Sequence, residues 1–253
     1  MAAADGVHAV DLGADVGAWF TGSTLHGVDD ANLAHHRPHV PARLAAARDA
    51  VGRRTGTDPA AWHLLRQVHG AAVATVDGEV PRGAELRDVD AAVTVEHDRP
   101  LVVLAADCLP LLVAGRRAVG VAHAGWRGVV ADVAGAVVTA LTSLGESVAD
   151  LTVVLGPTIG ACCYAVGADV ADAVADAAPG APVRTRTRDG RSSVDLRLAV
   201  RTRLATLGVT RVTDGPGTTA HCTACGSGWF SHRRDPAAGR HAGLVVRTTT
   251  ADR

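Results

Sequence analysis

Residues 101–128 read LVVLAADCLPLLVAGRRAVGVAHAGWRG, the stretch that decides how the chain folds around its candidate site. Two apolar runs flank Gly115-Arg116, and glycine followed by another residue suits a two-residue type II′ turn. The stretch therefore predicts an antiparallel hairpin in which residues whose numbers sum to 231 face each other. Cys108 and His123 satisfy that sum, so we expect their Cβ atoms about 4.5–5.5 Å apart. Pro110 cannot donate a ladder hydrogen bond and would permit a bulge that shifts the register by one residue.

Cys108 and His123 offer a thiolate and an imidazole, the ligands that zinc takes as a borderline-soft ion. His69, in the sequence QVHG at 67–70, is a third candidate ligand. Three protein ligands and one open position define a catalytic rather than a structural zinc site. The alternative is that Cys108 packs as a small buried hydrophobic residue and that both histidines are structural or surface residues.

Strand-like and helix-like runs are mixed along the rest of the chain. The strand-like runs are rich in valine or leucine and span 101–106, 118–123, 151–155 and 244–247. The helix-like runs span 41–51, 129–144, 169–177 and 195–207, the last with Asp195 as its N-cap. Residues 78–88 and 184–193 are predicted to be surface loops. The pattern predicts an α/β (α+β) fold in which residues 1–253 form a single compact domain, a mixed sheet with flanking helices.

Composition excludes several classes of function. The 253 residues carry 25 basic and 26 acidic side chains, so the net charge of −1 gives no reason to expect nucleic acid or a membrane surface as partner. Every basic residue is an arginine, and the lack of lysine excludes Schiff-base catalysis and a Walker-type phosphate loop. The chain shows neither a secretory signal pattern nor an apolar run of about 20 residues, so we expect a cytoplasmic protein with reduced thiols.

The remaining cysteines and a group of arginines carry weaker signals. Cys222-Thr-Ala-Cys225 is half of a zinc knuckle or a thioredoxin-type motif, but no second CxxC pair exists, and we favour packing in a loop. Cys162-Cys163 is interpreted as core. Arg127 is expected at the start of the helix that runs to 144, where backbone amides favour an anion. As a cluster, four arginines are expected to bind phosphate or carboxylate: Arg127, Arg233, Arg234 and Arg240.

Eight segments of the chain resemble the YfiH or laccase-domain family, also called polyphenol oxidase-like. They are QVHG (67–70), ADCLPLL (106–112), AHAGWRG (122–128), GPTIGACCYAVG (156–167), DLR (195–197), CTAC (222–225), FSHRRD (230–235) and GRHAGLV (239–245). The resemblance implies a compact α/β fold shared with a bacterial toxin's cysteine-hydrolase domain, and a zinc site formed by His69, Cys108 and His123. It also implies a purine nucleoside phosphorylase that converts adenosine, inosine or methylthioadenosine and phosphate to the base and a sugar 1-phosphate, with adenosine deaminase activity.

The N-terminal part departs from the family pattern. The family's Phe-Thr-Thr-Arg appears here as Phe20-Thr21-Gly22-Ser23, and its Asn-Leu-Gly appears as Asn32-Leu33-Ala34. A later Asn-Arg pair appears as Ala47-Arg48. The resemblance makes Asn32 and Arg48 candidates for binding phosphate or sugar, and the lost arginine would weaken or redirect the activity.

Three enzyme hypotheses use the same few residues. In a zinc-dependent phosphorylase, Cys108 and His123 act through the metal, Asp107 acts beside it or in proton transfer, and Arg127 and Arg48 hold phosphate. In a Cys–His hydrolase, an amidase that edits peptidoglycan precursors, Cys108 is a nucleophile activated by His123. A copper polyphenol oxidase is disfavoured because Met1 is the sole methionine and no His-x-His pair occurs, although Cu²⁺ binding at a Cys/His site is expected from the affinity order. Small-molecule nucleoside and phosphate are the expected partners of a monomer or homodimer.

Overall fold

The computed structural model describes residues 6–215 and 222–249, and two six-stranded mixed sheets run through it. In spatial order the first sheet contains β1 (Val7–Ala9), β2 (Val16–Thr21), β14 (His241–Arg247), β7 (Leu101–Ala105), β3 (His63–Arg66) and β5 (Leu86–Arg87). The second contains β13 (Arg211–Asp214), β10 (Thr152–Leu155), β8 (Leu109–Ala114), β9 (Val119–Ala124), β6 (Ala91–Thr94) and β4 (Val73–Thr75). The predicted α/β class is confirmed, but the prediction of one sheet is wrong.

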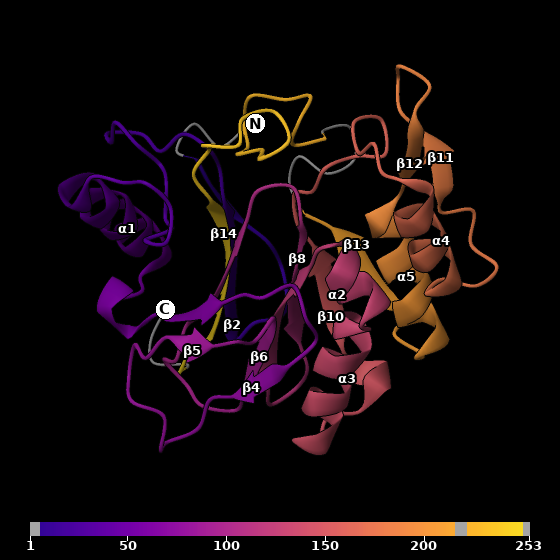
Figure 1. Cartoon of the computed structure of the whole chain (residues 1–253). Helices are drawn as coiled ribbons and strands as arrows, with labels where there is room; N and C mark the ends of the chain where they lie inside the picture. Colours follow the sequence, from indigo (N-terminus) through magenta and orange to yellow (C-terminus); the bar gives the residue numbers. More distant parts are fainter. Residues whose placement is uncertain (1–5, 216–221, 250–253) are drawn as a thin grey trace.

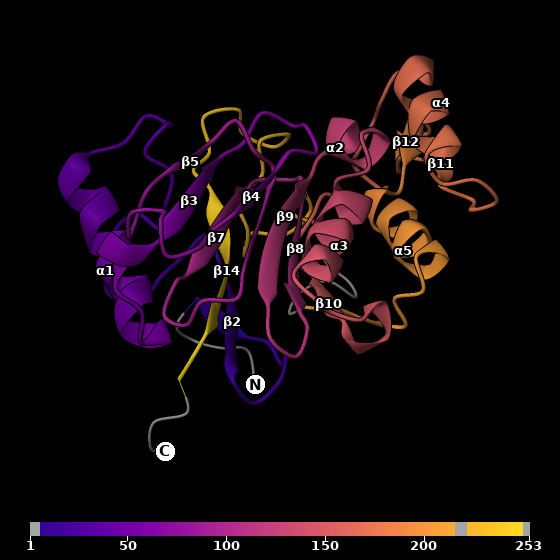
Figure 2. The ribbon, with the colours of Figure 1, turned by 90° about the horizontal axis from the view of Figure 1, so that it is seen from below.

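Helices cover the outer faces of the two sheets. Helix α1 (Pro41–Thr55) lies on the side of the first sheet, and α2 to α5 lie on the side of the second (Figures 1 and 2). The bounds of the latter are Trp126–Val130 for α2, Val133–Ser143 for α3, Ala168–Asp176 for α4 and Leu196–Thr206 for α5. Short 3-10 turns occupy Pro59–Ala61 and Val148–Asp150. Within the described ranges, no helix is long and apolar enough to cross a membrane.

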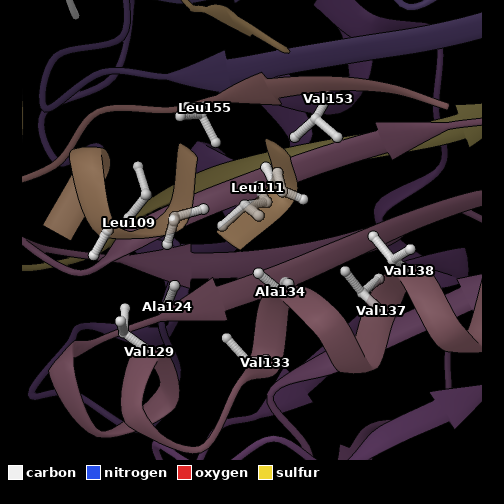
Figure 3. Packing of buried hydrophobic residues seen from close by; sticks show 14 of the residues in the cluster. Leu109, Leu111, Ala124, Val129, Val133, Ala134, Val137, Val138, Val153 and Leu155 are labelled. Carbon is white, nitrogen blue, oxygen red and sulfur yellow. The ribbon is translucent and has the colours of Figure 1, made fainter. Parts of the chain in front are cut away.

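Alternating side chains of β8 fill two separate hydrophobic layers. Leu109 and Leu111 belong to the same buried cluster as Val137 of α3 (Figure 3). Leu112, one residue further along the strand, belongs to the layer between the sheets together with Phe20. Because successive residues of a strand face opposite sides, a strand buried on both faces is apolar throughout, as β8 is. The β8–β9 hairpin thus lies at the centre of the molecule.

The register of this hairpin differs from the prediction. Pro110 pairs with His123 inside a regular ladder, so facing residues have numbers that sum to 233 rather than 231. The turn is centred on Arg116-Arg117, because the buried Glu146 carboxylate accepts the backbone N–H groups of Arg116 (2.9 Å), Arg117 (2.6 Å) and Ala118 (2.7 Å). Neither central residue has a positive φ, so the turn is not type II′. The predicted direct opposition of Cys108 and His123 is therefore wrong, but a shift of two residues keeps both side chains on one face.

The predicted helix over 129–144 is two helices, α2 and α3. The chain breaks at Asp132, which has a left-handed φ of 63°. Its carboxylate accepts the backbone N–H of Gly135 at 3.0 Å and so caps the start of α3. The same carboxylate binds Arg203 of α5 at 2.8 and 2.6 Å. The apolar period continues across the break, so the sequence pattern alone did not reveal it.

The other predicted elements are largely confirmed. The four strand-like runs correspond to β7, β9, β10 and β14, and Asp195 caps α5 by accepting Leu198 N–H at 2.9 Å. Helix α1 continues four residues beyond the predicted end and stops at Gly56, which has a φ of 68°. The prediction of a loop over 184–193 is wrong, since β11 (Arg184–Arg186) and β12 (Ser192–Val194) pair there as a hairpin. The loop predicted over 78–88 contains β5 at its end.

We expect Asp132→Ala to lower the free energy of unfolding by about 2–3 kcal/mol, because alanine lacks the cap and disfavours the left-handed conformation. Asp132→Asn retains both properties and loses only the charge pair with Arg203, so its cost should stay below about 1 kcal/mol. Urea unfolding at neutral pH measures both values. Equal losses in the two variants would show that the break does not depend on the cap.

Candidate metal centre

Three potential ligands meet at one end of the central hairpin. Cys108 directly precedes β8, His123 lies within β9, and His69 lies in the loop after β3. One ligand atom from each lies within 4.8 Å of the others, and the two imidazole rings are 4.9 Å apart at 74°. His123 is buried, Cys108 is partly exposed and His69 is exposed, so the group faces outward on one side. The sequence-predicted ligand set is thus brought together in the structure.

Gly125 makes room for this arrangement. A Cβ atom at this position would lie 2.9 Å from Sγ of Cys108 and 3.0 Å from Cδ2 of His69, closer than side-chain atoms pack. The observed register carries Cys108 past the end of β8 and toward this glycine instead of directly opposite His123. The cysteine and both histidines can therefore approach each other only because residue 125 has no side chain.

The buried carboxylate of Asp90 orients both His69 and His123. Its carboxylate, fully buried just before β6, accepts the Nδ1–H of His123 at 2.9 Å. It also accepts the backbone N–H groups of Val68 (3.1 Å), His69 (3.0 Å) and Gly70 (2.6 Å), and so holds the loop in which His69 has a φ of 63°. Because Nδ1 of His123 is engaged, Nε2 is the nitrogen left for a metal. Sequence reasoning missed Asp90, since nothing local distinguishes it among 26 acidic residues.

The charges of the centre are coupled. Burial raises the pKa of the Cys108 thiol, but the charge of His123 and hydrogen bonds from His123 and His69 outweigh burial and lower this pKa to about 6. Burial lowers the pKa of His123, but the Cys108 thiolate and Asp90 outweigh it and raise this pKa to about 9. A thiolate and two imidazoles form a donor set that fits Zn²⁺ and also Cu²⁺. The residues present therefore fit a metal ion.

The ligands lie in the wall of a cavity of about 500 Å³, a size typical of small-molecule sites. Five arginines and one acidic residue, Asp107, line it, so the cavity is suited to an anion. The aromatic residues Trp126 and Tyr164 add flat apolar surface. The arginines are Arg37, Arg66, Arg127, Arg233 and Arg240.

Arg127 differs from the other cavity arginines. Among the residues that the structure describes, its guanidinium makes no hydrogen bond or ion pair and lies 4.3 Å over the ring of Trp126. Arg66, by contrast, is paired with Asp88 at 2.8 Å, and Arg233 donates to the carbonyl of Ala165 at 3.0 Å. Arg127 lies in the first turn of a helix, as predicted, but that helix is α2, which ends at Val130 instead of continuing to 144. The Arg127 side chain nevertheless lies at the cavity and is available to an anion.

Asp107 lies next to the ligand Cys108 but is held by protein donors. Its carboxylate accepts the hydroxyl of Thr223 at 2.5 Å and the backbone N–H of Arg233 at 2.6 Å. Its carbonyl accepts the hydroxyl of Thr158 at 2.6 Å, and its φ is 87°. These contacts fix a strained turn directly before β8, so Asp107 sets the direction from which Cys108 enters the centre.

The structure does not bring Arg48, Asn32 or Arg234 to the cavity wall. Arg48 donates to the carbonyl of Leu33 at 2.9 and 3.2 Å, and Asn32 is buried and accepts the backbone N–H of Arg240 at 2.9 Å. Arg234 donates to the carbonyls of Thr223 and Trp229 at 2.7 and 2.8 Å. These side chains hold loops together, so the roles in phosphate or sugar binding predicted for them have no support in their positions.

The fold and the centre define a mixed α/β protein with a His–Cys–His site in a cationic cavity. The chain belongs to the family described as multi-copper polyphenol oxidoreductase laccase, whose sequence model matches residues 20–248. A Streptomyces griseus relative named purine nucleoside phosphorylase is 41% identical, over 81% of this chain and 82% of that protein. A Mycobacterium tuberculosis relative of the same name is 38% identical, over 86% and 84%.

Solved structures agree with this assignment. The structure of YlmD from Geobacillus stearothermophilus has a TM-score of 0.83 and 28% identity, covering 93% of each chain. A Neisseria meningitidis protein has a TM-score of 0.81 and 29% identity, covering 97% of this chain and 100% of its own. The fold and family predicted from the eight motifs are thereby confirmed.

We expect Asp90→Asn to weaken Zn²⁺ binding by about 10- to 100-fold, because an amide cannot accept from three backbone donors and His123 at once. Competition against a chromophoric chelator measures the affinity. Asp88→Asn is the matched control and should leave the affinity unchanged, since Asp88 is exposed and its carboxylate pairs, within the described part of the chain, with Arg66 alone. Unchanged affinity in folded Asp90→Asn would contradict the role given to this carboxylate.

Proposed function

We propose that the chain is a purine nucleoside phosphorylase that acts at the His69–Cys108–His123 centre, and that the metal held there is zinc. The observation that carries the proposal is the coincidence of this centre with a cavity lined by five arginines, in a chain 41% identical to a relative named purine nucleoside phosphorylase. A cavity of about 500 Å³ accommodates a nucleoside and a phosphate together.

Phosphorolysis joins a phosphate oxygen to C1′ of the sugar as the C1′–N bond to the purine breaks. The base leaves with the bonding electrons and takes up a proton at nitrogen. The guanidinium of Arg127, which has no hydrogen-bond partner among the described residues, binds the phosphate dianion through charge-assisted hydrogen bonds. Trp126 and Tyr164 offer ring faces against which a purine packs. A zinc ion held by His69, Cys108 and His123 would supply Lewis-acid chemistry.

Asp107 is assigned as a positioning residue in this proposal. Hydrogen bonds from Thr223 and Arg233 hold its carboxylate in place, and its backbone fixes the approach of Cys108. A direct part in proton transfer to the leaving base is the alternative role for this carboxylate.

The direct test is incubation of zinc-loaded protein with adenosine, with and without phosphate, followed by chromatography. The proposal predicts adenine and ribose 1-phosphate only when phosphate is present. Inosine formed without phosphate would report the adenosine deaminase activity that we propose alongside. A folded, zinc-bound protein that releases no base from adenosine, inosine or methylthioadenosine would overturn the phosphorylase proposal.

We expect Arg127→Gln to raise the KM for phosphate by about 10- to 100-fold, the equivalent of one lost charge-assisted interaction. Steady-state kinetics with varied phosphate measure it. Arg66→Gln is the control, because Arg66 lines the same cavity but is paired with Asp88, and its KM should change less than about threefold. Equal effects in the two variants would mean that general positive charge, not Arg127, binds phosphate.

A Cys–His hydrolase is the second candidate, favoured by the low pKa of Cys108 beside the imidazole of His123. In that reaction the Cys108 sulfur attacks an amide carbonyl, the amine leaves with a proton from His123, and water then releases the acid. A covalent adduct on Cys108 of the metal-free protein, found by mass spectrometry with a peptidoglycan-type amide, would support it. Retention of amidase activity in Cys108→Ser would exclude it.

A further inference from the structure

Four cysteines outside the centre described above meet in space. Cys162 and Cys163 lie in a turn after β10, and Cys222 and Cys225 lie in a second turn before β14. All four Sγ atoms lie within 4.8 Å of one another. Cys162 and Cys163, interpreted as core, are only partly buried, and they converge with Cys222 and Cys225 although the two pairs lie about sixty positions apart in the chain.

The distances between the sulfur atoms suit one metal ion. Sγ of Cys225 lies 3.2 Å from that of Cys163 and 3.5 Å from that of Cys162, and the sulfurs of Cys162 and Cys163 are 3.9 Å apart. A tetrahedral Zn²⁺ with Zn–S bonds of about 2.3 Å places its sulfur ligands roughly 3.8 Å apart. A disulfide needs a separation of about 2.05 Å, and all four thiols are free.

The local backbone explains how neighbouring cysteines point the same way. Adjacent residues in a strand face opposite sides, but Cys162 and Cys163 lie in a turn closed by a hydrogen bond from Cys163 N–H to the carbonyl of Gly160 at 3.0 Å. In the second turn the N–H groups of Cys225 and Gly226 both donate to the carbonyl of Cys222, at 3.0 and 3.1 Å. This is a compact CxxC turn that presents both sulfurs to one side.

Gly160 leaves the space into which the two turns fit. A Cβ atom there would lie 3.0 Å from Cβ of Cys222 and 3.2 Å from Sγ of Cys162. Any larger residue would push the turns apart, so this glycine allows the four sulfurs to meet.

We propose that Cys162, Cys163, Cys222 and Cys225 bind one Zn²⁺ ion through four thiolates, as a second and structural metal site. Four protein ligands fill the tetrahedral positions of zinc and leave none for a substrate, so the site is closed. It is distinct from the His69–Cys108–His123 centre and does not rest on the proposed phosphorylase activity.

A zinc ion at this site would cross-link the two turns that contain the cysteine pairs, and both turns contact residues that line the cavity. Thr223, next to Cys222, donates its hydroxyl to Asp107 at 2.5 Å and its N–H to the carbonyl of Thr158 at 3.1 Å. On the other loop Tyr164 follows Cys163 and lies 5.1 Å beneath the guanidinium of Arg233. A metal bound by both turns therefore fixes the partners of Asp107 and one wall of the cavity with a single cross-link.

The test is ¹¹³Cd NMR and metal analysis of the whole protein purified under reducing conditions and loaded with Cd²⁺ or Zn²⁺. The wild type should bind about two ions per chain and show a cadmium resonance at the far-downfield position of four thiolates. Cys222→Ser combined with Cys225→Ser should lose that resonance and about one ion per chain. Cys108→Ser is the matched control and should retain the four-thiolate resonance.

A second variant keeps the test decisive if the double variant does not fold. Cys225 is the exposed member, so Cys225→Ser alone should fold and should still lose the four-thiolate resonance. It should also increase proteolytic cleavage within 156–167 and 222–235, because the cross-link is lost. A wild type without the four-thiolate resonance would overturn the proposal, as would recovery of these cysteines as disulfides from metal-loaded protein.

Discussion

A carboxylate buried away from water costs several kcal/mol unless hydrogen bonds replace its hydration, and Asp90 meets this constraint with donors from two distant segments. Three backbone N–H groups come from the loop at 68–70, and a fourth donor is His123 on β9. Satisfying one charge therefore forces the two histidines into one place. The β8–β9 hairpin supplies the third ligand, because Cys108 directly precedes β8 and lies beside Gly125.

The family description refers to a copper oxidoreductase, whereas the relatives are named purine nucleoside phosphorylases, and the chemistry of the centre is compatible with both names. A thiolate with two imidazoles binds copper as well as zinc, which is compatible with a family description that refers to copper. A laccase needs several copper sites with paired histidines, and this chain has no His-x-His pair and no methionine beyond Met1. The cationic cavity above the centre instead suits a phosphate and a nucleoside. Site and relatives thus favour phosphorolysis over oxidation.

Sequence reasoning succeeded where a signal was local. The apolar runs around residue 115 predicted the hairpin, and the motifs containing His69, Cys108 and His123 predicted three side chains that do come together. It failed where a distant group decides the conformation: Glu146 sets the turn of the hairpin from about thirty residues away. Asp132 breaks a continuous apolar period because Arg203 and a cap hold it there.

The same physical explanation applies to the predicted site residues that do not line the cavity. Arg48 and Asn32 occupy positions that match family motifs, yet their polar groups form hydrogen bonds with backbone groups of the protein. A sequence motif does not distinguish a side chain that binds a ligand from one that binds the backbone. Asp90 and the four-cysteine cluster were missed because each depends on contacts between segments far apart in the chain. Long-range pairing of this kind appears only in three dimensions.

The most direct test of the central claim is a crystal structure of the protein grown with Zn²⁺ and phosphate, with anomalous data collected on both sides of the zinc edge. We expect an anomalous peak bound by His69, Cys108 and His123, with phosphate in the same cavity at hydrogen-bond distance from Arg127. Phosphate bound elsewhere, or no zinc on these three residues, would contradict it.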